Sequence, residues 1–303
     1  MFEVHRLRLL RELAARGTIA ATAKACSLTP SAVSQQLSVL QREAGTPLLV
    51  RDGRHLILTE AGRVLVEHAE QVLAGLEAAK AALEALSDSV SGVVRIAAFP
   101  TAASSLVPAA IAAAQAAHPD LTVSLEDREG SAGIAALRAG QIDLLLVYEY
   151  NLLPEITDPG IELTPLVTES LLAAVPATLR LPRGALRLTA LRDQPWIAPL
   201  SDSDLRATLE RACGLAGFSP RLAYTSDDYT VILALVSAGL GVSLVPQLAT
   251  ERTSADIGLR AVADPTLYRA VSVAVRAGSA RTPSLAVLIA ELRDQAGRLR
   301  LPA

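Results

Sequence analysis

A run of short polar side chains follows a strong helix-start signal near the N-terminus. Thr29 is a favourable N-cap residue and Pro30 suits the first helical position, so the sequence predicts a helix over residues 30–41. Its apolar residues fall three and four positions apart and predict one buried stripe. The other positions carry hydroxyl and amide groups suited to base edges and phosphates in a DNA major groove. The residues of this candidate DNA-reading surface are Thr29, Pro30, Ser31, Ser34, Gln35 and Ser38.

Two flanking elements must hold this helix in place. Residues 19–26 predict a short Ala-rich helix followed by a tight turn, so the two helices form a helix-turn-helix. Residues 48–51 and 56–59 predict two short strands joined as a hairpin. Arg51 and Arg54 of this hairpin are placed to meet phosphates or an adjacent minor groove. A small helical bundle with a polar face and a solvated loop is the alternative.

Residues 59–86 predict one long helix that begins at the capping residue Thr59. Its apolar residues alternate four and three positions apart, a period of about 3.5 that is typical of a coiled-coil seam. One helix cannot bury such a seam alone, so we expect a second copy of the chain to cover it. A single amphipathic helix lying on its own chain would show a similar stripe. The expected dimer contacts are Leu65, Val72, Leu76 and Leu83.

Strand and helix patterns alternate beyond a polar hinge at residues 87–92. The alternation over residues 93–245 predicts parallel sheets with helices on both faces, arranged as two lobes around a cleft. Ligands of such sheets bind where the strands end. Polar groups at these strand ends could instead be simple helix caps. The polar strand ends are residues 100–104, residues 199–202, residues 225–228 with Asp227, and the pair Tyr148 and Glu149.

Length and charge fit a DNA-binding globular protein. The chain has 303 residues, enough for two or three domains, and no run of eighteen apolar residues. Its N-terminus shows neither the apolar core nor the cleavage site of a secretory signal, so we expect a cytoplasmic protein. Residues 1–65 hold nine Lys or Arg against five acids, and the remainder holds nineteen against twenty-six. A basic first domain on an acidic body suits phosphate binding.

No motif indicates an enzyme, a metal centre or a cofactor. The sequence contains no nucleophile elbow, SxxK motif or phosphate loop. Gly239 and Gly241 lack the third glycine of a dinucleotide-binding fingerprint. Four scattered histidines and two cysteines give no metal-ligand spacing. We therefore predict a protein without catalytic residues, metal or cofactor, which argues against a hydrolase or transferase.

About sixty N-terminal residues resemble the winged helix-turn-helix of the LysR-type transcriptional regulators. The residues that carry this resemblance are Ala23, Ala32, Val33, Ser34, Leu40, Glu43, Gly45, Leu48, Arg51 and the run at residues 58–62. The candidate DNA-reading surface departs from the family pattern. Pro30 and Ser31 stand where the family usually has Gln-Pro, and Gln35 stands where Arg is common. Gln41 replaces a usual acid.

The body resembles the effector domain of the same family through residues 142–144, residues 239–242 and Pro246. The resemblance implies an α/β chain with an N-terminal winged helix-turn-helix, a linker helix and a two-lobed domain similar to periplasmic binding proteins. The implied boundaries are 1–58 for the DNA-binding domain, 59–88 for the linker, and 92–303 for the effector domain. Lobe I is expected at about 93–163 and 268–295, and lobe II at about 164–267.

The same resemblance implies a sequence-specific transcriptional regulator that is controlled by a small molecule bound between the lobes. Its implied partners are double-stranded DNA, the small-molecule effector, a second copy of the chain in a homodimer or dimer of dimers, and RNA polymerase. A solute-binding protein shares the C-terminal fold and is the alternative. That function would need a secretory signal and would have no use for a DNA-binding head.

Family members bind effectors at positions that correspond here to Thr101, Ser131, Pro199 and Ser201. Thr101 and Ser201 at helix starts suit an anion, whereas the nearby carboxylates suit an amine. The charge of the effector therefore stays open.

The two cysteines lie in different expected domains. Cys26 takes an apolar helical position and is expected to be a small core residue. Peroxide-sensing relatives carry a pair of reactive cysteines near the position of Cys213, but this chain has Asp204 at the place of the first one. We therefore expect no disulfide switch.

Overall fold

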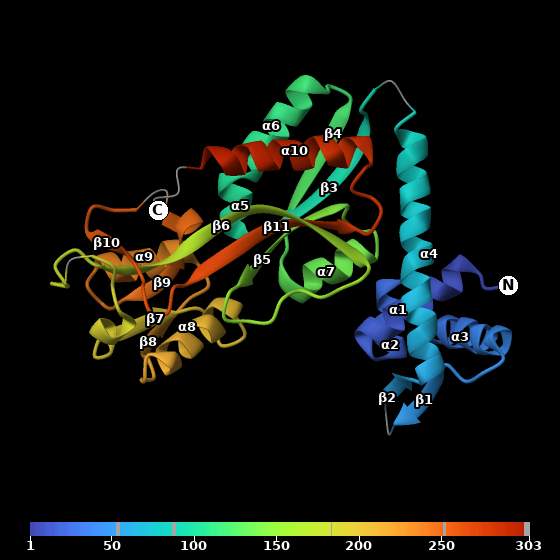
Figure 1. Cartoon of the computed structure of the whole chain (residues 1–303), viewed down its shortest axis with the longest axis horizontal. Helices are drawn as coiled ribbons and strands as arrows, with labels where there is room; N and C mark the ends of the chain where they lie inside the picture. The colour runs from blue at the N-terminus through green and yellow to red at the C-terminus, as the bar shows by residue number, and fades with distance from the viewer. Residues whose placement is uncertain (53–54, 87–88, 183, 251–252, 300–303) are drawn as a thin grey trace.

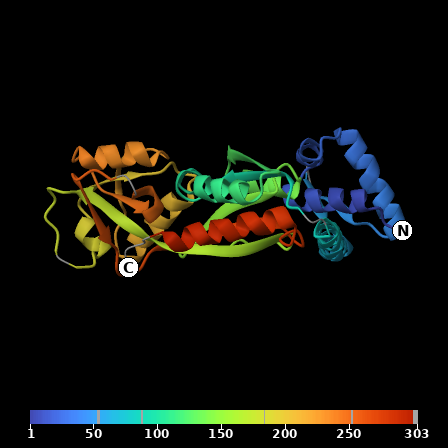
Figure 2. The same cartoon turned by 90° about the horizontal axis from the view of Figure 1, so that it is seen from above.

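The computed structural model is elongated, with a small helical head at one end and a larger α/β body at the other (Figure 1). It describes residues 1–303 apart from 53–54, 87–88, 183, 251–252 and 300–303. One long helix joins the head to the body, and the view from above shows the parts arranged in a row (Figure 2). Within the described residues, no helix is both long and apolar enough to cross a membrane.

The head is a helix-turn-helix followed by a hairpin, as the sequence predicts. Its elements are α1 (Val4–Arg16), α2 (Ile19–Ala25), α3 (Pro30–Ala44), β1 (Leu49–Asp52) and β2 (His55–Leu58). Thr29 caps α3 by accepting a hydrogen bond from the Ala32 amide at 3.2 Å, and Gly45 ends the helix in the left-handed conformation. The predicted apolar stripe of α3 is confirmed, because Val33, Leu37 and Leu40 are all buried in the head's core.

The linker helix α4 (Glu60–Glu84) starts against the hairpin. The Thr59 hydroxyl caps it by accepting from the Gly62 amide at 3.0 Å, which confirms the predicted N-cap. A Cβ atom at Gly62 would lie 2.2 Å from the Leu48 carbonyl oxygen, so only glycine lets the helix approach the hairpin this closely. The first turn of α4 is therefore fixed relative to the head.

The two sides of α4 differ in burial. Ala69, Leu73 and Ala81 are buried against the rest of the chain. On the other side Val72, Leu76 and Leu83 are 45%, 44% and 69% exposed, which leaves an apolar stripe uncovered. Leu65, the fourth residue of the expected dimer seam, is only partly accessible because it packs against the head's core.

Lobe I combines three parallel strands with two further strands that come later in the chain. Its elements are β3 (Gly92–Ala98), α5 (Pro100–Ser105), α6 (Val107–Ala117), β4 (Leu121–Asp127), α7 (Gly130–Arg138), β5 (Leu144–Tyr150), β11 (Tyr268–Arg276) and α10 (Pro283–Arg298), together with the first part of β6 (Ile161–Pro176). Strand β3 is parallel to β4 and β5, and β11 is antiparallel to β5 and β6. Helices α6 and α10 lie side by side on one face (Figure 2), and α7 packs on the other.

Lobe II is built around the far end of β6. Its remaining elements are the 3₁₀ turns η1 (Leu188–Leu191) and η2 (Gln247–Thr250), strands β7 (Pro195–Ala198), β8 (Arg221–Thr225), β9 (Ser243–Pro246) and β10 (Ile257–Ala261), and helices α8 (Asp204–Leu215) and α9 (Tyr229–Ser237). Strands β9 and β10 pair with β6, and β7 pairs in parallel with β8. Trp196 lies fully buried in the core of this lobe.

Two expectations from the sequence are wrong in detail. The main sheet is mixed rather than parallel, because β6, β9, β10 and β11 pair antiparallel. The sequence also predicts one helix over residues 102–117 within the alternating pattern, where the structure has two, α5 and α6. Pro108 near the start of α6 has no N–H to continue the preceding helix, so the chain breaks there.

Candidate functional site

The polar residues predicted to contact DNA lie together on the outside of α3. Thr29, Pro30, Ser31, Ser34, Gln35 and Ser38 are all exposed. Three of their hydroxyls already have partners, since Thr29 bonds to the Ala32 amide and to the Ser31 hydroxyl, and Ser38 donates to the Ser34 carbonyl oxygen at 2.8 Å. Among the described residues, Gln35 has no hydrogen-bond partner for its side chain. Its amide is therefore available for a base edge.

Gln41 fixes the hairpin, which carries Arg51, to helix α3. Arg51 is exposed on β1, and Arg54 lies outside the described residues. The Gln41 side-chain oxygen accepts hydrogen bonds from the Leu48 and Leu49 amides, both at 3.1 Å. From the sequence Gln41 is only a departure from the family pattern, and its hydrogen bonds to the hairpin are not predicted. A polar residue near the end of a helix, seven residues before a strand, was the available signal.

A cavity of about 960 Å³ opens between the lobes on one side. Thr101 on α5 of lobe I and Asp227 before α9 of lobe II both line it. Asp227 accepts a hydrogen bond from the Leu200 amide at 2.9 Å. The structure thus brings together two of the strand-end residues that the sequence selected.

A second cavity of about 330 Å³ lies between α7 and α8. Ser131, Tyr148 and Glu149 line it from lobe I, and Asp204 lines it from lobe II. Pro199 and Ser201 border neither of the two cavities: Pro199 is buried, and Ser201 is exposed on the surface. Five of the seven expected effector contacts therefore line an interlobe cavity.

An ion pair that sequence reasoning did not predict lies where the lobes meet. Arg269 is 2% exposed, and its Nε donates to a Glu169 carboxylate oxygen at 2.7 Å. A second nitrogen of the same guanidinium donates to the Thr101 hydroxyl at 3.1 Å. The guanidinium also lies over the rings of Phe99 and Tyr148, at 4.8 and 5.1 Å from their centroids. The available signals in the sequence were Arg269 at the start of the apolar run of β11 and Glu169 next to that of β6.

The charged residues that line the two cavities are all carboxylates. Glu129, Glu149, Asp204, Asp227 and Asp228 border them, and neither cavity has a Lys, Arg or His among its described lining residues. Burial raises the pKa of Glu129 above its ordinary value, and the neighbouring Asp127 and Asp227 charges raise it further. The Tyr148 hydroxyl donates to Glu129 at 3.2 Å, which partly offsets that increase in the pKa.

The described part of the chain contains neither an activated thiol nor a cluster of metal ligands. Burial raises the pKa of the Cys213 thiol to about 12, so this thiol stays protonated at neutral pH. Burial and the nearby Glu12 carboxylate also raise the pKa of Cys26. No group of three or more His, Cys, Asp or Glu side chains is placed to hold a metal ion, as far as the structure describes them.

Comparisons with known proteins match both parts of the chain. Residues 4–63 match the family described as "Bacterial regulatory helix-turn-helix protein, lysR family", and residues 87–297 match "LysR substrate binding domain". A "Probable hydrogen peroxide-inducible genes activator" of Mycobacterium avium is 30% identical, over 97% of this chain and 96% of that protein. The "Nitrogen assimilation regulatory protein nac" of Klebsiella aerogenes is 26% identical, over 92% and 90%.

Solved structures share the fold of this chain over almost its whole length. Full-length CbnR in complex with its target DNA is 26% identical, covers 97% of this chain and 100% of its own, and has a TM-score of 0.54. HinK, a LysR family transcriptional regulator from Pseudomonas aeruginosa, is 21% identical, covers 99% and 100%, and shares the fold with a TM-score of 0.62.

We predict that Glu129→Gln stabilises the chain at neutral pH. Because folding raises the pKa of Glu129, its charged form is disfavoured in the folded state, whereas glutamine is neutral and can still accept from Tyr148. The midpoint of thermal unfolding should rise at about pH 7. This gain should shrink as the pH falls through the raised pKa, and vanish below the ordinary carboxyl value of 4.5, where the glutamate is itself protonated.

The matched control is Glu155→Gln, which removes an exposed carboxylate from the same lobe. It should change the unfolding midpoint little at either pH. A stabilisation by Glu129→Gln that persists at about pH 3 would contradict the assignment of the effect to the charge of Glu129.

Proposed function

Because the chain belongs to the LysR family of bacterial transcriptional regulators, we propose that its α3 surface reads a specific DNA sequence under the control of a small molecule bound between the lobes. The family makes it a DNA-binding transcriptional regulator with an effector-binding domain, and no enzyme. One observation supports the proposed control above all. The same chain carries a free polar helix surface on its head and cavities of about 960 and 330 Å³ between its lobes.

The alternative of a transport solute-binding protein fits the structure less well. The head is packed onto α4 and lobe I rather than attached by a loose tether, and its proposed DNA-facing surface has no role in transport. Some relatives are named as activators of hydrogen peroxide-inducible genes, but peroxide sensing through a cysteine pair is not proposed for this chain. Cys213 is buried with a raised pKa, and Asp204 lies on the cavity where a second cysteine would be needed.

The exposed stripe of α4 supports self-association. Val72, Leu76 and Leu83 line up on the side of α4 that faces away from the body, and each is more than a third exposed. A second copy of the chain that pairs through the same stripe would cover these side chains and place two heads on one DNA site with two-fold symmetry. We propose this homodimer as the basic unit, a dimer of dimers as its assembly on DNA, and RNA polymerase as the further partner.

Replacement of Gln35 tests DNA reading. Gln35→Ala removes the free amide, so the preference for the best duplex over a single-base variant should fall by roughly 1–3 kcal/mol, the value of one bidentate base contact. Duplexes selected from a random pool by the parent chain serve as targets, and binding is measured by fluorescence anisotropy. The control Gln71→Ala removes an exposed glutamine of α4 and should leave the preference unchanged. If Gln35→Ala also leaves it unchanged, Gln35 does not read a base.

A charge in the α4 stripe tests the dimer. Leu76→Asp would bury an unpaired carboxylate between two copies, so we expect the mass from light scattering to fall to that of one chain. Gln71→Asp adds the same charge on the same helix outside the stripe and should keep the parental mass. A dimer that survives Leu76→Asp but not Gln71→Asp would show that another face of α4 forms the contact.

A thermal-shift screen of the full chain against metabolites tests effector control. A ligand present at about 100 times its Kd should stabilise the folded chain by roughly 2.7 kcal/mol. Ser131→Trp and Ser104→Trp place an indole in the smaller and the larger cavity respectively, and an interlobe effector should lose its shift in one of them. A ligand whose shift survives in both variants binds elsewhere, and the interlobe site is then wrong.

A further inference from the structure

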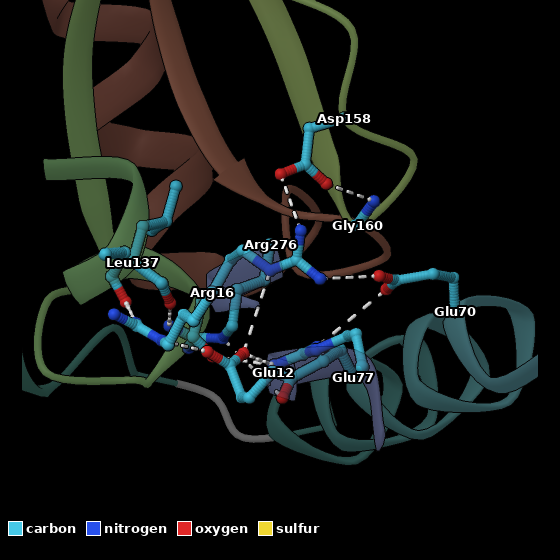
Figure 3. Close-up of polar contacts among 11 residues, drawn as sticks. Glu12, Arg16, Glu70, Glu77, Leu137, Asp158, Gly160 and Arg276 are labelled. Carbon is cyan, nitrogen blue, oxygen red and sulfur yellow. Dashed lines mark hydrogen bonds and ion pairs between the residues drawn. The ribbon is translucent and has the colours of Figure 1, made fainter. Parts of the chain in front are cut away.

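The head docks on lobe I through a nearly buried polar network, which we call the head–lobe seam (Figure 3). It joins three separate parts of the chain in alternating charges. The residues of the seam are Arg11, Glu12 and Arg16 on α1, Glu70 on α4, Arg138 on α7, and Asp158 in the loop before β6.

Arg138 is the centre of the seam. One of its terminal nitrogens lies 2.7 Å from Asp158 of lobe I, and the other lies 2.8 Å from Glu70 of the linker helix. Its Nε is 3.7 Å from Glu12 of the head. A single guanidinium on the last residue of α7 therefore contacts lobe I, the linker and the head at once.

Two arginines of the head also bind the backbone at the end of α7. Arg11 donates to the Arg138 carbonyl oxygen at 3.0 Å, and Arg16 donates to the Ala135 carbonyl oxygen at 3.3 Å. The last carbonyls of a helix have no partner within the helix and carry partial negative charge. Backbone amides beyond α7 already bond to the Ala135, Ala136 and Leu137 carbonyls, so the head supplies the partner of the Arg138 carbonyl and adds positive charge at the helix end.

Lobe I holds the linker helix closely beside this network. A Cβ at Gly278 would lie 2.2 Å from the Ala74 carbonyl oxygen, and a Cβ at Gly160 would lie 2.7 Å from the Glu70 carboxylate. Gly278 also has φ +85, a conformation that favours glycine. These contacts bring lobe I against the backbone of α4.

The opposite end of α7 lines the smaller interlobe cavity. Gly130 and Ser131 in its first turn, and Glu129 at its N-cap, border the cavity of about 330 Å³ that α8 closes from lobe II. Helix α7 is only nine residues long. A ligand that displaces the first turn therefore displaces the last turn, where the head is attached.

The seam is not fully satisfied. The Nε atoms of Arg11 and Arg138 are buried without a hydrogen-bond partner among the described residues. A cavity of about 370 Å³ runs along the seam, lined by Arg11, Glu12, Glu70 and Arg138 among others. Buried polar atoms without partners and unfilled space both disfavour the docked arrangement. These two features make the docked arrangement less stable than a fully satisfied network would be, so a change at α7 can shift it.

We propose that α7 couples the smaller interlobe cavity to the docking of the head, with Arg138 as the positioning residue that transmits the change. The coupling rests on the proposed function in one respect, since it assumes that the effector fills this cavity. An occupant at the first turn of α7 shifts the last turn, weakens or strengthens the contacts of Arg138, and so changes how firmly the head is held for DNA.

A native thiol reports the opening of the seam without added labels. Cys26 lines the seam cavity and is half-buried, whereas Cys213 is fully buried in lobe II. The rate constant for alkylation of Cys26 by N-ethylmaleimide in the full-length chain then measures access to the seam. An unreacted Cys213 in the same sample shows that the variant is folded.

Arg138→Gln should accelerate alkylation of Cys26 by about fivefold or more, the factor of a typical coupling between sites. Arg192→Gln is the matched control, because Arg192 also donates to a backbone carbonyl after a helix, at Gly217 in lobe II. It should leave the rate unchanged. If Arg138→Gln exposes Cys213, Arg16→Gln replaces it, since that change removes the two seam contacts of Arg16, with the Ala135 carbonyl and with Glu12, and keeps every ion pair of Arg138. An unchanged rate in the folded seam variant overturns the proposal.

The decisive measurement combines both ends of α7. Ser131→Trp fills the smaller cavity and should change the Cys26 rate by about fivefold or more in the parent chain, and hardly at all when Arg138→Gln is also present. Ser104→Trp fills the larger cavity from α5 and should have no effect. No effect of Ser131→Trp, or an equal effect in both backgrounds, overturns the coupling. The DNA-binding and effector tests described above are independent of this outcome, so failure of the coupling leaves the proposed function standing.

Discussion

A fully buried ion pair between Arg269 and Glu169 determines how the two lobes meet. The residues are directly opposite each other in the β11–β6 pairing, at the point where β6 leaves the lobe I strands and begins to pair with β9 and β10. The pair also holds neighbouring parts in place, since Arg269 donates to Thr101 and Glu169 accepts from the Leu248 amide at 2.6 Å. Loss of one partner from such a pair typically costs about 3–5 kcal/mol, because it leaves the other charge buried and alone. Because this contact fixes how the lobes meet, it also fixes the shape of the two interlobe cavities.

The two charged networks of the chain differ in how completely they are satisfied. At Arg269 hydrogen bonds and two aromatic rings surround the guanidinium, and no polar side-chain atom of the Arg269–Glu169 pair is buried without a partner in the described structure. At the head–lobe seam, Arg11 and Arg138 each bury an unpaired Nε beside a cavity. Low local dielectric strengthens a satisfied network and penalises an incomplete one. The buried polar atoms where the lobes meet are therefore all paired. At the attachment of the head they are not, so the head is easier to displace than one lobe from the other.

Local signals predicted the head well, whereas contacts between distant segments were not predictable. Thr29, Thr59 and the buried stripe of α3 follow from capping and periodicity, which depend on neighbours within a few residues. The strand ends also located Thr101, Tyr148, Glu149 and Asp227 near the cavities, and the family resemblance located Ser131 there. In contrast, Arg138 finds Glu70 across 68 positions of sequence, and Arg269 finds Glu169 across 100. No periodic pattern encodes such pairs, and a charged residue in a helix or strand looks like an ordinary solvated side chain until the fold is known.

The internal hydrogen bonds of α3 leave it few free donors. The hydroxyl of Thr29 caps the helix and that of Ser38 bonds to the preceding turn, and the described α3 surface presents no arginine or lysine before Arg42. Beyond Gln35, such a surface has little capacity to form bidentate contacts with guanine. In the DNA reading proposed above, Gln35 supplies the direct base contact, and the rest of the preference among sites comes from how readily the duplex bends or narrows to meet the protein, because the cost of deforming DNA depends on its sequence. Operators that share the base met by Gln35 should then also share flexible steps and groove width.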